Sequence, residues 1–165
     1  MTTLRPLRVE TAPQYAQLGE LLIAYEADLP SDLRHNEDLT GEALDSAYGG
    51  RSAAFLVEVD DRVAGCVAVG EIDLETAVLK RLFVRARYRG VGAARALVET
   101  ALAFVRDRGY RRVVLDTEKE RLRPAYELYR SFGFEECAAY GEVDYRFPTF
   151  MELRLAPKQL ADDRI

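Results

Sequence analysis

The sequence predicts an α+β fold in which about seven strands form one mixed sheet, flanked by about four helices. Short apolar segments with strand composition follow one another between residues 53 and 84. The apolar spacing becomes helical after Gly92, and a strand, a helix and a strand follow within about 40 residues. Such a unit is a right-handed crossover, which makes one pair of strands parallel.

A strand, two helices and three further strands are predicted in the first half of the chain. Thr11 and Thr40 are N-cap residues, each placed just before a helix. Asp60-Asp61-Arg62 has the composition of a hairpin turn, so the strands beside it are antiparallel. The predicted elements are a strand over residues 4–9, helices from Thr11 to about Tyr25 and over 41–48, and strands over 53–59, 63–69 and 76–84.

Two helices and three strands are predicted in the second half. Gly109 and Gly133 each end a helix, because glycine readily adopts the left-handed conformation that follows a helix C-terminus. The predicted elements are a helix between Gly92 and Gly109, a strand over 113–115, a helix over 124–132, and strands over 134–139 and 150–155. Residues 1–156 are assigned to one domain and residues 157–165 to a polar C-terminal tail.

Composition and charge exclude several classes of protein. The chain has 28 acidic and 23 basic residues, and its net charge of -5 gives no attraction to nucleic acid or anionic lipid. Cys66 and Cys137 stand far apart, without the close Cys or His pairs of a zinc site or a disulfide framework. No apolar stretch has the length of a signal peptide or a membrane span. We therefore expect a cytoplasmic monomer or homodimer without a metal and without a nucleic acid or membrane partner.

Residues 82–97 carry the clearest functional signal. A strand ends there, the chain bends through small residues, and a helix begins with its free N–H groups and partial positive charge facing the bend. Gly90 and Gly92 let oxygen atoms approach the backbone closely, and Arg89 adds positive charge. The segment predicts a binding site for a diphosphate group.

Other phosphate-binding motifs do not fit this spacing. A dinucleotide fingerprint requires a third glycine where Arg95 stands, and a Walker loop requires a Gly-Lys-Ser/Thr ending that is absent. The structural alternative is a tight turn that only starts a helix. The strand before the bend and the basic residues around it favour the phosphate site.

The segment Arg89-Gly90-Val91-Gly92-Ala93-Ala94 resembles the signature of the GNAT N-acetyltransferase superfamily, which is Arg or Gln, two residues, Gly, one residue, then Gly or Ala. The strand over 79–84, the segment 128–134 and the order of elements from Leu4 to Leu155 resemble that family as well. The resemblance implies acetyl-CoA as cosubstrate, no metal, and a parallel pair of strands that splay apart.

The resemblance also implies which residues contact acetyl-CoA. The pyrophosphate would bind the bend, formed by Arg89, Gly90, Val91, Gly92, Ala93 and Ala94. The pantetheine arm would pair with the backbone of the preceding strand, at Leu82, Phe83 and Val84. An extended ligand can replace ladder hydrogen bonds that splayed strands lose.

The implied reaction is direct attack of a primary amine on the acetyl thioester in a ternary complex. An alkylammonium of pKa ~10.4 must first lose its proton, which costs about 4.6 kcal/mol at pH 7. Matching the family pattern, Tyr129 would donate a proton or a hydrogen bond to the departing thiolate. Tyr129 also lies on an apolar helical stripe, which leaves a purely structural role open.

The sequence departs from the family pattern at two positions. Leu122 stands where the family often has an Asn that touches pantetheine, and Val78 stands where many relatives carry a Glu. The usual carboxylate base is therefore missing, and Glu75 is our candidate. Other carboxylates near strand ends are alternatives: Glu71, Asp73, Asp116 and Glu118. His35, the only histidine, is expected to be exposed.

The sequence leaves the identity of the acceptor open. Lys80 and Arg81 are neighbours in a strand, so we expect them to point to opposite faces, where one could bind a substrate carboxylate. The acidic loop after the first helix could instead attract a polycation. Candidate acceptors are amino-acid-like amines, polyamines or drugs, and a protein N-terminus or lysine. A non-catalytic module that binds acyl-CoA is the alternative from another class.

Overall fold

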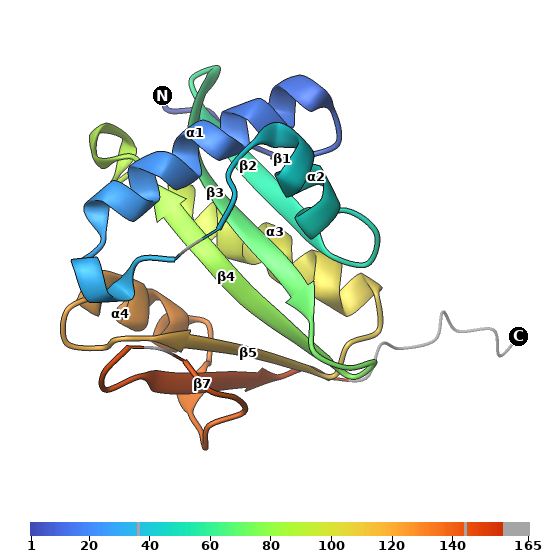
Figure 1. The fold of residues 1–165 in the computed structure, drawn as a ribbon, viewed down its shortest axis with the longest axis vertical. Coiled ribbons are helices and arrows are strands. Elements are labelled where there is room, and N and C mark those ends of the chain that lie inside the picture. The colour runs from blue at the N-terminus through green and yellow to red at the C-terminus, as the bar shows by residue number, and fades with distance from the viewer. Residues whose placement is uncertain (36, 144, 157–165) are drawn as a thin grey trace, which may run out of the picture.

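The computed structural model describes residues 1–35, 37–143 and 145–156, which form a seven-stranded mixed sheet with helices on both faces (Figure 1). The strand order is β1-β2-β3-β4-β5-β7-β6. The strands are β1 (Leu4–Arg8), β2 (Ala53–Val59), β3 (Arg62–Glu71), β4 (Thr76–Val84), β5 (Arg112–Thr117), β6 (Glu135–Glu136) and β7 (Thr149–Arg154). The helices are α1 (Ala12–Asp28), α2 (Gly41–Tyr48), α3 (Ala93–Asp107) and α4 (Arg123–Ser131), with short 3-10 turns η1 (Ser31–Leu33) and η2 (Ala86–Tyr88). The predicted fold class is confirmed.

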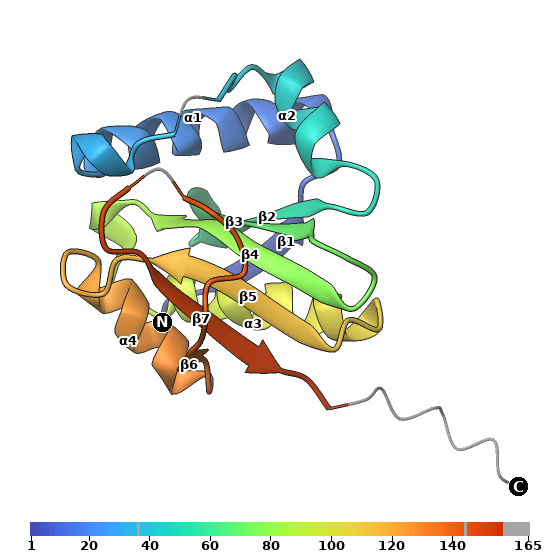
Figure 2. The same cartoon turned by 60° about the horizontal axis from the view of Figure 1, so that its bottom comes forward.

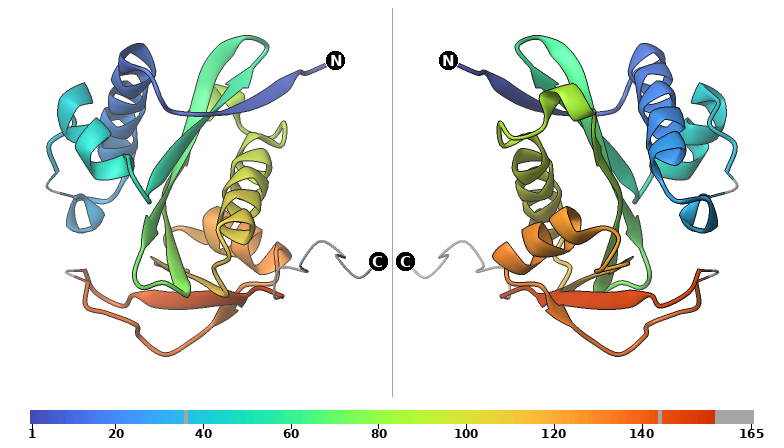
Figure 3. Two further views of the ribbon diagram at one scale, coloured as in Figure 1. Left: turned by 90° about the vertical axis from the view of Figure 1, so that its right-hand side faces the viewer. Right: turned by 90° about the vertical axis from the view of Figure 1, so that its left-hand side faces the viewer.

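The helices bury an apolar layer on each face of the sheet. Figure 3 shows α1 and α2 on one face and α3 and α4 on the other. The inward stripe of α3 is at most 2% exposed and consists of Leu97, Val98, Ala101, Leu102 and Val105. These positions have the spacing of one helix face, which is why this helix was predictable from the sequence. None of the helices in the described ranges is long and apolar enough to cross a lipid bilayer.

Local capping fixes where α1 begins. The Thr11 hydroxyl accepts a hydrogen bond from the Gln14 N–H (3.3 Å), and the Gln14 side chain accepts one from the Thr11 N–H (2.9 Å). The helix runs three residues past the predicted end at Tyr25, to Asp28. It stops there because Leu29 precedes Pro30, and the residue before a proline disfavours helical backbone.

Strands β4 and β5 are the parallel pair, and they are paired over only a short stretch. Residues Thr76–Val78 pair with Arg112–Val114. Beyond that stretch β4 continues to Val84 and β5 to Thr117 without further pairing between them. Figure 1 shows the two strands starting side by side and then separating. The predicted splayed pair is therefore present.

A bulge in β4 changes the direction of two side chains. Arg81 has φ +62°, and the register between β3 and β4 shifts between Cys66 and Ala68. As a result, Lys80 and Arg81 both point to the α1 and α2 face: the ammonium of Lys80 lies over the ring of Tyr48, and Arg81 contacts side chains from α1 and the loop after it. The prediction that these neighbours point to opposite faces is wrong, because strand alternation fails at a bulge.

The predicted strand over 134–139 is wrong in length. Only Glu135 and Glu136 form a strand, and one further hydrogen bond joins the Cys137 N–H to the Phe150 carbonyl (2.8 Å). The chain then leaves the sheet and passes toward the α1 face (Figures 2 and 3), where Tyr140 contacts β5. The predicted tail over 157–165 lies outside the described residues.

Gly65 on β3 provides a test of this packing. A Cβ at Gly65 would lie 2.5 Å from the Phe83 carbonyl oxygen on β4, so Gly65→Ala must displace backbone. We expect it to lower the free energy of unfolding by about 1–3 kcal/mol, measured by urea denaturation. Gly41→Ala is the control, because its Cβ would meet nothing closer than 3.8 Å, and a change within about 1 kcal/mol is expected. Equal losses in both variants would contradict this account.

Candidate functional site

The bend between β4 and α3 has the geometry predicted for an anion site. Gly90 and Gly92 have φ +84° and +90°, a backbone that L-residues with side chains rarely adopt. Gly92 is the N-cap of α3 and has no side chain to accept a capping hydrogen bond. The N–H groups of the first helical turn therefore lack both a helical partner and a cap. The bend thus offers free backbone donors at the positive end of a 15-residue helix.

The side chain of Arg89 holds the bend in place. Its Nε donates to the Val84 carbonyl (2.8 Å), and Nη2 donates to the carboxylate of Asp28 at the end of α1 (3.2 Å). About half of the Arg89 side chain is exposed. Arg89 thus joins the end of β4, the bend and the end of α1, and its charge remains accessible to an anion.

The edge of β4 that faces β5 is open next to this bend. Leu82, Phe83 and Val84 lie beyond the last residue of β4 that pairs with β5, which is Val78. On the other edge, Val84 and Phe83 pair with β3. An extended ligand could therefore add to the open edge of β4 through backbone hydrogen bonds.

Tyr129 on α4 is buried in the apolar layer that α3 and α4 form with the sheet. The residue is 7% exposed, and its ring packs edge-on against Phe134 (5.8 Å between centroids). Burial raises the pKa of Tyr129, and the nearby Tyr25 and Asp116 raise it further. Tyr25 is on α1. Leu115 on β5 packs on the α3 side of the sheet, and neighbouring strand residues face opposite sides, so Asp116 faces the α1 side. Tyr129 is thus near enough to Tyr25 and Asp116 for them to affect the pKa of its hydroxyl.

Three of the candidate carboxylates lie at the end of β4 and β5 where the two strands are still paired, which we call the closed end. Glu75 is exposed and immediately precedes β4, and its carbonyl accepts from the N–H groups of Arg111 and Arg112. Six residues separate Glu75 from the bulge at Arg81, which is roughly 20 Å at ~3.3 Å per residue. The structure therefore does not bring Glu75 together with Tyr129. Glu71 and Asp73 lie at the same closed end. Glu71 pairs with Arg51 (2.5 Å), and Asp73 accepts a hydrogen bond from the Glu75 N–H (2.9 Å).

Glu118 is buried and has a structural role. Its carboxylate accepts the N–H groups of Glu120 (3.1 Å) and Arg121 (2.6 Å) in the turn before α4. It also forms an ion pair with the Arg121 side chain (3.4 Å). Glu118 thus satisfies backbone donors in this turn.

Asp116 is the candidate carboxylate that lies at the open end. It accepts hydrogen bonds from the hydroxyls of Tyr140 (3.1 Å) and Tyr145 (2.6 Å). Asp116 is itself exposed, and no basic side chain lies within ion-pair distance of it in the described ranges. Sequence reasoning named Asp116 as one alternative among several and could not single it out, because both tyrosines follow more than 20 residues later in a segment without a regular pattern.

Arg81 and Lys80 differ in their partners. The Arg81 side chain is 4% exposed and bonds the carboxylates of Glu26 (2.6 Å) and Glu37. Lys80 forms no ion pair among the described residues, and its ammonium lies over the ring of Tyr48 (5.6 Å to the centroid). Burial lowers the pKa of Lys80, while Glu37 acts in the opposite direction. Arg81 is thus occupied by the protein, and Lys80 is available to a ligand.

Tyrosines surround this region, and the sequence reasoning missed four of them. Burial raises the pKa of Tyr25 and of Tyr48 to about 12, and it raises the pKa of Tyr140 and Tyr145 as well. The ring of Tyr25 also lies 5.7 Å from that of Phe83 on β4. The high count of nine tyrosines was the available signal, but no local pattern showed that they meet.

His35, the only histidine, is exposed, as expected. Its side chain is 44% exposed, its N–H donates to Glu26 (2.8 Å), and its Nδ1 lies 2.8 Å from the same carboxylate. Within the described ranges, no group of three or more His, Cys, Asp or Glu residues is arranged to hold a metal ion.

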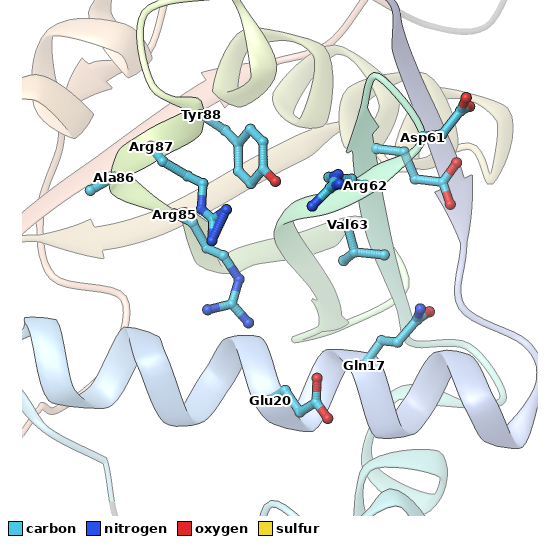
Figure 4. A pocket seen from close by; sticks show the side chains of 10 residues that line it. Gln17, Glu20, Asp61, Arg62, Val63, Arg85, Ala86, Arg87 and Tyr88 are labelled. Atoms are coloured by element: carbon cyan, nitrogen blue, oxygen red, sulfur yellow. The ribbon is translucent and has the colours of Figure 1, made fainter.

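A separate hollow of about 590 Å³ lies between α1, β3 and η2 (Figure 4). Arg62, Arg85 and Arg87 line it together with Glu20 from α1. Glu58 and Asp61 also line it, so three carboxylates balance three guanidinium groups. The hollow includes neither Tyr129 nor Asp116, and we assign the candidate site to the opening between β4 and β5.

Comparisons with known proteins agree on one family. The profile of the Acetyltransferase (GNAT) family matches residues 17–134. Human N-acetyltransferase 8 is 40% identical over 90 residues, a match that spans 52% of this chain and 39% of that protein. An uncharacterized N-acetyltransferase of Schizosaccharomyces pombe is 36% identical over 112 residues, which is 66% of this chain and 68% of that protein. The chain therefore spans about two fifths of the human relative, and about two thirds of the yeast one.

Solved structures share the fold over nearly the whole chain. An acetyltransferase from Streptococcus agalactiae has a TM-score of 0.72 and 25% identity, covering 92% of this chain and 98% of that one. The structure of yncA from Salmonella typhimurium, with its cofactor acetyl-CoA, has a TM-score of 0.75 and 20% identity, covering 97% and 96%.

The buried ion pairs of Arg81 predict a large effect of its removal. Arg81→Met removes the buried cation that bonds both Glu26 and Glu37, so we expect the free energy of unfolding to fall by about 3–5 kcal/mol in urea denaturation. Arg5→Met is the control, because the Arg5 side chain in its ion pair with Glu58 is 67% exposed, and a change within about 1 kcal/mol is expected. A loss of similar size in the two variants would show that the Arg81 pairs do not stabilise the bulge.

Proposed function

Because this chain belongs to the GNAT family of acetyltransferases, we propose that it moves the acetyl group of acetyl-CoA to the primary amine of a small molecule. The amine attacks the thioester directly within a ternary complex, without an acyl-enzyme. The observation that carries the proposal is the uncapped start of α3 next to the open edge of β4.

The residues of the bend fit the CoA portion of acetyl-CoA. The backbone N–H groups from Gly90 to Ala94 would hold the pyrophosphate, and Arg89 would add charge. The backbone of Leu82 to Val84 would pair with the pantetheine arm. Acetyl-CoA supplies the reactive thioester, which this arrangement would direct along β4 toward Tyr129.

Tyr129 is assigned to the leaving thiolate as a hydrogen-bond donor. Its raised pKa disfavours complete transfer of the proton, because the CoA thiol is more acidic than a buried tyrosine. The neutral hydroxyl can still donate a hydrogen bond to the charge that develops on sulfur. This assignment is narrower than proton donation, and it follows from the burial of the side chain.

We assign contact with the acceptor amine to Asp116 in place of Glu75. Asp116 lies at the open end of the strand pair, and it influences the pKa of Tyr129. Two tyrosine hydroxyls fix its position. A carboxylate held there can bind the ammonium and accept its proton, which frees the nitrogen lone pair for attack on the thioester.

Release of free thiol from acetyl-CoA across a panel of amines tests the proposal. Thiol release that depends on both an amine and the protein supports it. Tight binding of acetyl-CoA with no release for any amine would instead support the alternative, a non-catalytic module that binds acyl-CoA.

Tyr129→Phe tests the assignment to the leaving group. We expect kcat to fall roughly 10- to 100-fold, because a hydrogen bond to a charged group contributes about 1.5–3 kcal/mol. The affinity for acetyl-CoA, measured by calorimetry, should stay nearly unchanged. Tyr126→Phe is the matched control on the same helix: its hydroxyl bonds Glu136 (2.8 Å) outside the proposed site, so kcat should be retained. An unchanged kcat in Tyr129→Phe would remove the assignment.

Gly92→Ala tests the backbone site for the pyrophosphate. An alanine disfavours φ +90°, so the bend must change shape, and we expect acetyl-CoA affinity to fall at least about tenfold in calorimetry. Gly109→Ala places the same kind of strain, at φ +82°, just after the other end of α3. The control should lose stability but keep its affinity. Equal affinities in the two variants would place the phosphates elsewhere.

A further inference from the structure

We infer that the acceptor is a monoamine whose amine is attached to an aromatic or similarly apolar body, and that polyamines are poor substrates. The inference rests on the proposed acetyl transfer and concerns the acceptor side of the same site. Two features of the α1 face carry it: the balance of charges around Asp116 and the tyrosines that surround it.

Most acidic residues at the end of α1 and in the loop after it are already paired with cations of the protein, which weakens the attraction to a polycation. Asp28 pairs with Arg89 (3.2 Å), and Asp32 pairs with Arg121 (2.9 Å). Glu26 and Glu37 both bond Arg81. The carboxylate of Asp38 accepts the Thr40 N–H just before α2 (3.0 Å). Most of these acids are thus engaged with a specific cation of the fold.

The charges next to the bulge also balance. The carboxylates of Glu26 and Glu37 face the guanidinium of Arg81, and the ammonium of Lys80 adds a second positive charge that acts on Glu37. Two negative and two positive groups therefore offset one another. Among the described residues, Asp116 lies at the opening without an ion pair to a basic side chain, so its carboxylate can take one ammonium group.

The groups that contact Asp116 are neutral and aromatic. Tyr140 and Tyr145 donate to its carboxylate, and burial raises the pKa of both, so they stay protonated near neutral pH. Tyr25 and Tyr129 lie near enough to Asp116 for its charge to raise the pKa of their hydroxyls. Rings around a carboxylate provide apolar contact area for the body of a ligand and a favourable face for its ammonium.

Lys80 disfavours a second positive charge on the acceptor. Its ammonium is near enough to Asp116 for that carboxylate to affect its pKa, and it reaches solvent on the same face. An extended diamine bound to Asp116 would bring its distal ammonium toward the ammonium of Lys80, and the two like charges repel. A phenyl ring at that position meets tyrosines instead.

The experiment compares kcat/KM for 2-phenylethylamine, 1,4-diaminobutane, spermidine and a peptide with a free N-terminus. We expect 2-phenylethylamine to exceed the diamine and spermidine by about tenfold or more. Higher kcat/KM for spermidine, the diamine or the peptide would overturn the inference while leaving acetyl transfer intact. No thiol release with any amine, despite binding of acetyl-CoA, would overturn both the inference and the proposed function.

Two variants and one control test whether the charges of Asp116 and Lys80, rather than a loss of folded protein, determine which acceptor is used. Asp116→Asn keeps the size of the side chain and removes its charge, so KM for 2-phenylethylamine should rise about tenfold with acetyl-CoA affinity unchanged. Asp61→Asn in the β2–β3 turn is the control, and its KM should not change. Lys80→Gln should raise kcat/KM for 1,4-diaminobutane relative to 2-phenylethylamine. An unchanged KM in Asp116→Asn, or an unchanged substrate ratio in Lys80→Gln, contradicts the assignment.

Discussion

Hydrogen bonding between β4 and β5 stops after Val78 and Val114, and the candidate site depends on this interruption. A continuous ladder would leave no open backbone edge on β4 next to the bend at Gly90. Beyond Val78 this edge of β4 has no β5 partner, and Arg89 Nε donates to the Val84 carbonyl near its end. Since unpaired backbone groups are costly away from water, this edge favours an extended polar partner.

The bulge at Arg81 sets the chemistry on the α1 side of this opening. It turns Arg81 and Lys80 to the same face, where Arg81 binds two carboxylates from the α1 side of the molecule. The bulge thus joins β4 to α1 and the following loop through buried charges. Those charges are satisfied within the fold, so the acceptor side is less acidic than the sequence suggested. The character of the site then comes from Asp116 and tyrosines.

The parts of the fold that local chemistry determines were predictable from the sequence. Thr11 and Thr40 fix helix starts through their own hydroxyls, and the stripe of α3 shows its buried face directly. The bend at Gly90 and Gly92 was predictable for the same reason, because glycine tolerates the backbone it requires. Features that arise from contacts between distant segments were not. Nothing around Arg81 signals a bulge, because a non-glycine residue there adopts φ +62° only in its tertiary setting.

The sequence also did not show at which residue the pairing between two strands ends. Strand alternation assigns a face to each side chain, but it does not say where pairing between two strands ends. Glu75 and Asp116 both stood near predicted strand ends, and only the register of β4 and β5 separates the closed end from the open one. The segment after β6 was also mispredicted, because Tyr140 and Tyr145 contact Asp116 on β5.

Cys66, whose thiol donates to the Arg81 carbonyl (3.4 Å), has a practical consequence for assays of this protein. Burial raises its pKa to about 12, and burial also raises the pKa of the half-buried Cys137. The thiolate form of a cysteine attacks a thiol-reactive dye, and both cysteines of this protein hold their protons near neutral pH. A chromogenic reagent should therefore report CoA set free in solution against a small background from the protein.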